Sequence, residues 1–195
     1  MPFCPDGNSP GNGAADPSTT GQAGAAGPQD DLQGDGPAEP PPTPPPPPTH
    51  PEIVATVCPP SPSPVIGHSP HQYGITGLET WLWSDGIHTS TATGVIRGYP
   101  VDCTLTATQF TFDTGDDHAG RYGHQRVYTS PNPGTEDETT DVRHMWEVKG
   151  TYQLALTITW SRTSNYGADT TTSTTTKAHP VKEIVIGMTT APNNR

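Results

Sequence analysis

Apolar and polar residues alternate over much of the second half of the chain. In segment 150–160, GTYQLALTITW, every second residue from Tyr152 to Trp160 is apolar. A strand turns successive side chains to opposite faces, so this pattern predicts a strand with one buried face. Similar patterns and the lack of a clear amphipathic helix predict an all-β antiparallel sandwich. The other expected strands occupy residues 80–85, 88–96, 100–107, 109–113, 141–148, 169–178 and 181–187.

Some of these segments allow finer predictions. Val101, Cys103 and Leu105 share one parity, whereas Phe110 and Phe112 fall on the other. A turn or bulge near residues 107–109 is therefore expected. Segment 169–178 is predicted to pair back onto 150–160 through the turn SRTSNYG. Residues 114–140 are predicted to form a long loop, and 51–57 (PEIVATV) a short extended segment.

Composition divides the chain. Among 195 residues there are 25 Pro and 21 Gly, and little apolar sequence precedes residue 51. Such a segment cannot bury enough surface to offset the entropy of ordering. The run from Pro40 to Pro48 is typical of a stiff polyproline spacer. We predict a disordered acidic tail with this spacer (residues 1–50), a proline-rich linker (51–73), the β-sandwich (74–188) and a flexible C-terminus (189–195).

The net charge is −11, and all Lys and Arg lie after residue 95. This balance argues against nucleic-acid partners, whose phosphates need a basic patch, and against anchoring on an anionic membrane. The sequence contains no apolar run of about 20 residues, so no transmembrane segment is expected. The start of the chain, MPFCPDGNSPGNG, also lacks the basic and apolar regions of a signal peptide.

Three cysteines, Cys4, Cys58 and Cys103, lack the spacing of a zinc site. A Cys58–Cys103 disulfide would tie the linker to the sandwich in an oxidising compartment. The alternative, which we favour from the sequence, is that Cys103 is a buried free thiol, because free cysteine is commonly buried.

Segments 110–117 (FTFDTGDD) and 144–160 (HMWEVKGTYQLALTITW) resemble the two signature motifs of polycystic-kidney-disease (PKD) domains. With GLETWLW at 77–83 and VKEIVIG at 181–187, they are similar to single-domain PKD-like proteins exported by actinobacteria. The resemblance implies an immunoglobulin-like sandwich outside the cytoplasm that contacts protein or carbohydrate. The matched positions are Phe112, Asp113, Gly115 and Asp116 in the first motif and Trp146, Gly150, Tyr152, Leu154, Leu156 and Ile158 in the second, with Asp117 replacing a glycine.

Several side chains of these motifs have expected local roles. Asp113 and Asp116 are predicted to accept backbone N–H groups in a turn. The Tyr152 hydroxyl is expected to bond back to a turn, and Gly150 to form a tight turn before the long strand. The alternative for the aspartates is calcium, the one cofactor considered, bound by oxygen ligands. That site would use Asp113, Asp116 and Asp117 with the loop acids Glu136, Asp137 and Glu138.

No sequence motif nominates a catalytic nucleophile. The leading hypothesis is a non-catalytic extracytoplasmic module for protein–protein contact or a structural role at the cell surface. One alternative is a carbohydrate- or cell-wall-binding domain that uses Trp81 and Trp83 as ligand-stacking residues, although core packing of both is also expected from their strand. A further alternative is a small hydrolase that uses His118 and Asp116 in the long loop.

Overall fold

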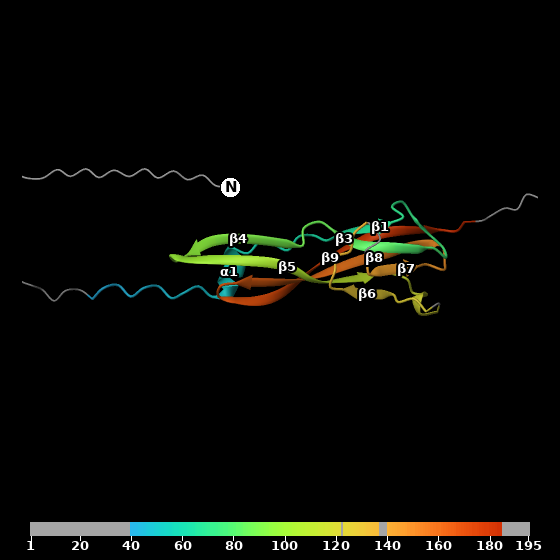
Figure 1. Cartoon of the computed structure of the whole chain (residues 1–195). Helices are drawn as coiled ribbons and strands as arrows, with labels where there is room; N and C mark the ends of the chain where they lie inside the picture. The colour runs from blue at the N-terminus through green and yellow to red at the C-terminus, as the bar shows by residue number, and fades with distance from the viewer. Residues whose placement is uncertain (1–39, 122, 137–139, 185–195) are drawn as a thin grey trace, which may run out of the picture. The chain divides into compact units, whose positions relative to one another are not determined.

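The computed structural model describes residues 40–121, 123–136 and 140–184. Contacts between Cα atoms divide the chain into two units, 1–43 and 44–195. Of the first unit, only the exposed residues 40–43 are described. All described helices and strands belong to the second unit (Figure 1). The predicted tail before residue 40 and the predicted C-terminus at 189–195 lie outside the described residues.

The second unit is a β-sandwich of two unequal sheets. Sheet A has the order β1-β3-β7, and sheet B has the order β2-β9-β8-β5-β4, with β6 beside β5. All pairs are antiparallel except the short β2–β9 pair. The strands are β1 (Val65–Ser69), β2 (Gly74–Ile75), β3 (Glu79–Asp85), β4 (Thr89–Ile96), β5 (Tyr99–Asp113), β6 (Val127–Ser130), β7 (Val142–Met145), β8 (Gly150–Ser164) and β9 (Gly167–Lys182).

The alternation in the sequence directs one face of sheet B into the main core. Leu154, Leu156, Ile158 and Trp160 of β8 are all buried. In β5, the register shifts between Ala107 and Gln109. Because of this bulge, Phe110 and Phe112 lie on the same face of β5 as Leu105, although their positions in the sequence have the opposite parity. The change of parity in the sequence predicted such a bulge. The core also takes in Ile66, Leu82, Leu105, Phe110, Phe112, Val142, Trp146 and Val181.

Sheet B extends beyond sheet A, and a short helix, α1 (His50–Thr56), lies at this extension (Figure 1). Ile53 of α1 is fully buried and packs with Val101 and Cys103 in a second small core. The structure joins Cys58 to Cys103 by a disulfide. The free-thiol interpretation of Cys103 is therefore wrong for this structure, because the linker after α1 crosses the sheet within bonding distance.

Four expectations about segment boundaries are wrong. Residues 114–140 were expected to form one long loop, but Val127–Ser130 within this range form β6, which pairs with β5. Residues 51–57 were expected to be extended, yet most of them belong to α1, because Glu52 accepts the Thr49 N–H at 2.8 Å and Pro51 suits the first turn. The sandwich begins at β1, within the predicted linker. Residues 181–187 were expected to form a separate strand, but Val181 and Lys182 end β9, and residues from 185 lie outside the description.

Candidate functional site

The outer face of sheet B is a surface of threonines. Strands β4, β5, β8 and β9 bury one face, so their alternate residues point away from the core. These side chains are neighbours across strands: Thr106 pairs with Ser161, which pairs with Thr170, and Thr111 pairs with Thr157, which pairs with Thr174. We call this surface the threonine face; it comprises Thr89, Thr91, Thr93, Thr104, Thr106, Thr111, Thr157, Thr159, Thr163, Thr170, Thr172, Thr174 and Thr176.

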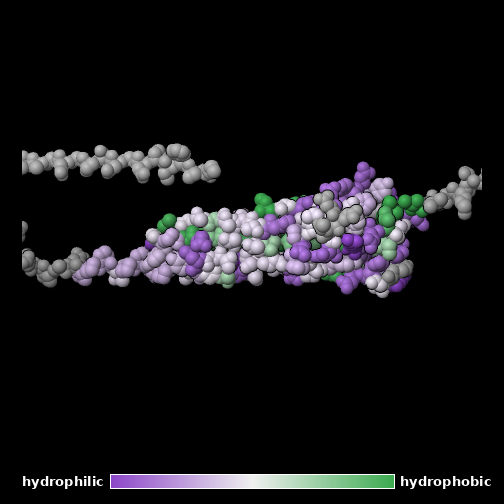
Figure 2. Space-filling view, in the orientation of Figure 1, coloured by the Kyte–Doolittle hydropathy of each residue, from purple (hydrophilic) through white to green (hydrophobic). Residues whose placement is uncertain are grey.

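The threonine face is solvent-accessible and nearly free of charge. Each of its threonines is exposed or half-buried. On this outer face of the described strands, charged side chains occur only near strand ends, at Asp102 and Asp113 of β5 and at Lys182 of β9. Figure 2 shows a related contrast on the side it displays: much of the sheet B extension is near neutral, and strongly hydrophilic residues gather toward the end that carries sheet A. A protein of net charge −11 therefore presents a large uncharged hydroxyl surface.

The acidic loop is organised by an arginine. Arg126 donates from Nε to Asp113 Oδ1 at 2.9 Å and also pairs with Asp117. Burial raises the Asp113 pKa, but hydrogen bonds from Arg126 and from the Gly115 N–H outweigh burial and hold it below the ordinary value. Arg126 thus already pairs with two of the three aspartates of the hypothesised calcium site.

The calcium hypothesis gains no support from these contacts. Glu136 accepts from His71 at 2.9 Å instead of joining the three aspartates, while Asp137 and Glu138 lie outside the described residues. Within the described chain, no group of three or more His, Cys, Asp or Glu side chains could hold a metal ion. The expected turn role is observed, because Asp113 accepts the Gly115 N–H and Asp116 accepts the His118 N–H, both at 2.9 Å.

Asp116 also forms one end of a buried chain of polar groups. Its Oδ2 lies 3.1 Å from His144 Nε2, and His144 Nδ1 lies 3.1 Å from the Tyr128 hydroxyl. Burial lowers the His144 pKa and outweighs the opposing effect of Asp116, so the ring is neutral. A neutral ring donates from Nε2 to the carboxylate and accepts the Tyr128 proton on Nδ1. His118 Nδ1 lies 3.6 Å from Asp116 Oδ1.

Two more histidines are buried where β1 approaches β9. The rings of His68 and His179 are 4.6 Å apart, and the His179 ring lies 4.8 Å from Trp146. Burial, with help from His68 and Lys177, lowers the His179 pKa to about 4. Burial also lowers the His68 pKa. From the sequence, most histidines were expected in linkers or loops. An alternating strand pattern does not distinguish a histidine in the core from one on the surface.

Trp81 and Trp83 share a face of β3, as expected, but have different surroundings. Both point away from Leu82, which enters the core. Trp83 is nevertheless buried: its indole lies directly against Gly67, its neighbour on β1, and Gly134 lies against its Cβ. Its indole N–H donates to Asp85 at 2.7 Å. Trp81 is only half-buried, with the Arg143 guanidinium 5.6 Å from its ring.

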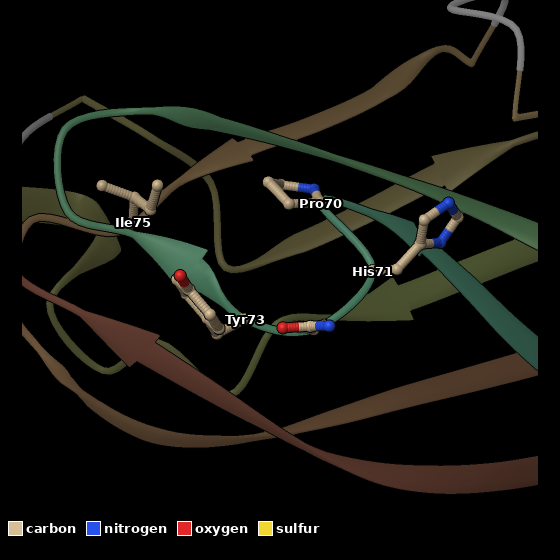
Figure 3. A pocket seen from close by; sticks show the side chains of 5 residues that line it. Pro70, His71, Tyr73 and Ile75 are labelled. Atoms are coloured by element: carbon tan, nitrogen blue, oxygen red, sulfur yellow. The ribbon is translucent and has the colours of Figure 1, made fainter.

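Two hollows meet at Pro70. One, of about 220 Å³, is lined by Pro70, Leu78 and Trp81, among others. The other, of about 320 Å³, follows the loop between β1 and β2; Figure 3 shows His71 toward one end of this loop and Tyr73 and Ile75 toward the other. Lys182 lies 4.0 Å from the centre of the Tyr73 ring. Aromatic side chains beside shallow hollows can stack on flat ligands.

The motif residues have structural positions in the sandwich. Phe112 and Trp146 are core residues, and the Tyr152 hydroxyl donates to Val148 O at 2.6 Å, as expected. Gly115 has φ 67°, and a Cβ there would lie 2.6 Å from Gln153 O. Gly150 was expected in a tight turn, but it is the first residue of β8, paired with Val181.

Asp117 fits without the conformation that favours glycine. Among the described residues, Arg97 is the only non-glycine residue with positive φ. The replacement of the motif glycine by Asp117 is therefore compatible with this turn.

Comparison with known proteins finds no matching family model, no similar curated protein and no similar solved structure. Among the described helices, none is long and apolar enough to cross a membrane. The geometry itself is thus the basis for a functional proposal. The threonine face was not predicted, although the sequence carries a signal for it: segments 88–96 and 169–178 have threonine at alternate positions.

Proposed function

We propose that this chain is a non-catalytic contact module of the PKD-like, immunoglobulin-like type that works outside the cytoplasm. The observation that carries the proposal is the threonine face, a four-stranded surface of accessible hydroxyl and methyl groups with charges only at its ends. Such a surface offers hydrogen bonds and apolar contact without attracting ions. It suits a partner that is uncharged where it makes contact.

Two further features support this reading. The Cys58–Cys103 disulfide is typical of oxidising compartments outside the cytoplasm. The polar chain of Asp116, His144 and Tyr128 is mostly buried. The group that contacts His144 Nδ1 is the Tyr128 hydroxyl, where a hydrolase of the triad type would have a serine or cysteine nucleophile. A stabilising role for this chain accounts for its burial better than hydrolysis does.

A photo-crosslinking side chain at Thr159, at the centre of the threonine face, tests the proposal in the native host. The expected result is a discrete crosslinked partner at the cell surface. The matched control carries the same group at the exposed Arg121, on the short helix Ala119–Arg121 away from that face. Equal crosslinking from both positions, or none from Thr159, argues against the threonine face as the contact surface.

The second candidate is binding of carbohydrate at Trp81. It is favoured by the half-buried Trp81 ring beside the hollow at Pro70. Retention on an insoluble polysaccharide should fall with Trp81→Ala and persist with Val95→Ala, a change at an exposed site on β4. Trp83 is a poor probe because it is buried, so its loss would disturb folding. Retention that is unchanged by Trp81→Ala counts against this candidate.

A further inference from the structure

The edge of β9 is a long stretch of strand with a free side. β9 pairs with β8 from Gly167 to Val181. On its opposite side, within the part of the chain that the structure describes, only β2 pairs with it, at Val181 and Lys182. The backbone groups that point away from β8 between Gly167 and Pro180 therefore have no neighbouring strand there. Such an edge is a template for another extended chain.

The sequence of this edge is nearly its own mirror image. Residues 169–177 read DTTTSTTTK, which is symmetric about Ser173 except that the two ends carry opposite charges. In an antiparallel pair with a two-fold axis at Ser173, Thr172 lies opposite Thr174 of the second copy. Asp169 then lies opposite Lys177 of the second copy, and the same pair recurs at the other end. The segment is thus complementary to itself in both shape and charge.

The charged ends select one register. A shift of the axis by one residue along the strand removes both Asp169–Lys177 pairs. An axis between residues would place an outward-facing residue opposite an inward-facing one, which the pleat of an antiparallel pair does not allow. Asp169 already accepts from Arg162 Nε at 2.8 Å, and Lys177 Nζ donates to Ile66 O at 3.3 Å. The charge pairs therefore act mainly on register and specificity rather than on affinity.

The edge also lacks the usual protection against pairing. Residues 170–176 contain neither charge nor proline, the devices that commonly block exposed edges. The other end of sheet B, at β4, differs: its strand has eight residues, contains Gly94 and has no complementary charges at its ends. Self-complementarity is therefore a property of β9 rather than of sheet edges in this chain generally.

We propose that the β9 edge is a self-association surface, where two copies of this chain pair antiparallel about Ser173. The pairing joins two copies of sheet B into one continuous sheet and aligns their threonine faces on one side. The pairing uses the free backbone groups of β9, whereas the proposed contact uses threonine side chains that point outward from four strands, so failure of this proposal leaves the proposed function untouched.

Sedimentation equilibrium over a range of concentrations tests the proposal, with the full chain in a Cys4→Ser background to prevent adventitious disulfides. Thr172→Lys/Thr174→Lys places like charges opposite each other in the pair and should weaken dimerisation about tenfold. Thr172→Glu/Thr174→Lys places opposite charges there and should restore it. Both positions are exposed, so circular dichroism should show an unchanged fold.

The matched control is Thr157→Lys/Thr159→Lys, which adds the same charges to the same face on β8, one strand in from the edge. It should dimerise like the parent chain. A parent chain that is monomeric at every concentration overturns the proposal, as does a double-lysine β9 variant that dimerises normally. Equal loss of dimer in the β8 control also overturns it, because association would then use the threonine face.

Discussion

His144 Nε2 lies 3.1 Å from Asp116 Oδ2, in a contact that leaves 0% and 3% of the two side chains exposed. The contact joins β7 to the turn that follows β5, and Tyr128 of β6 extends it on the other side of the imidazole. Three separate elements are thus held by one set of hydrogen bonds. Because these groups are buried, each needs its partner in the folded state.

Asp116→Ala should therefore lower the free energy of unfolding by about 3 kcal/mol, since the His144 N–H and the His118 backbone N–H both lose their acceptor. Asp117→Ala is the matched control, because that carboxylate is 78% exposed and its ion pair with Arg126 should contribute less than about 1 kcal/mol. Urea unfolding of both variants measures the difference. Equal losses would contradict a special role for the buried contact.

How far the sequence predicts this structure depends on whether a pattern is local. The alternation in β8 and the parity break in β5 were sufficient to predict the long strand, its buried face and the bulge, because side-chain period is a local property. The helix α1 was missed although Thr49 and Glu52 form a capping box, since its β-branched residues favoured a strand interpretation.

The candidate sites depend on contacts between distant segments. Trp83 packs against Gly67 of β1 and against Gly134, about 50 positions away. The contact between His68 and His179 likewise comes from tertiary packing. Arg126 reaches Asp113 and Asp117 because β6 pairs back onto the end of β5. The threonine face is intermediate: its residues are visible in the sequence, but its continuity requires the strand order of sheet B.

The buried His179 predicts a pH-dependent stability. Its pKa is about 4 in the folded protein because burial, His68 and Lys177 disfavour the charged ring, whereas the unfolded chain titrates near its ordinary value of 6.5. The unfolded state therefore binds more protons between these values. The stability of the folded state that depends on a neutral His179 is therefore fully present above pH 6.5. It falls by about 3 kcal/mol as pH drops toward 4.

His179→Phe keeps an aromatic ring beside Trp146 and removes this titration. Its free energy of unfolding should vary less between pH 6.5 and 4 than that of the parent chain. His71→Gln serves as the matched control, since it removes an exposed histidine instead of a buried one. Urea denaturation at several pH values gives the comparison, and identical profiles for His179→Phe and the parent chain would count against this origin.

The disulfide connects the segment after α1 to the middle of β5 across 45 residues of sequence. Closing a loop of this size restricts the unfolded chain, so Cys58→Ala/Cys103→Ala should lower the free energy of unfolding by about 2–4 kcal/mol. Reduction of the parent chain should produce a similar loss. Cys4→Ser, which lies outside the described residues, is the control and should melt like the parent. A double variant as stable as the parent would contradict the expected contribution.

Gly115 is required by two constraints that act at the same atom. Its φ of 67° disfavours other residues, and an added Cβ would lie 2.6 Å from the carbonyl oxygen of Gln153, a backbone atom of β8 that cannot turn aside as a side chain can. Gly115→Ala should lower the free energy of unfolding by about 1–3 kcal/mol. Gly120→Ala is the matched control, because nothing lies within 4 Å of its Cβ position and its φ is ordinary. Denaturant unfolding should separate the two variants clearly; if Gly115→Ala proves as stable as Gly120→Ala, the turn and β8 are not in the close contact described.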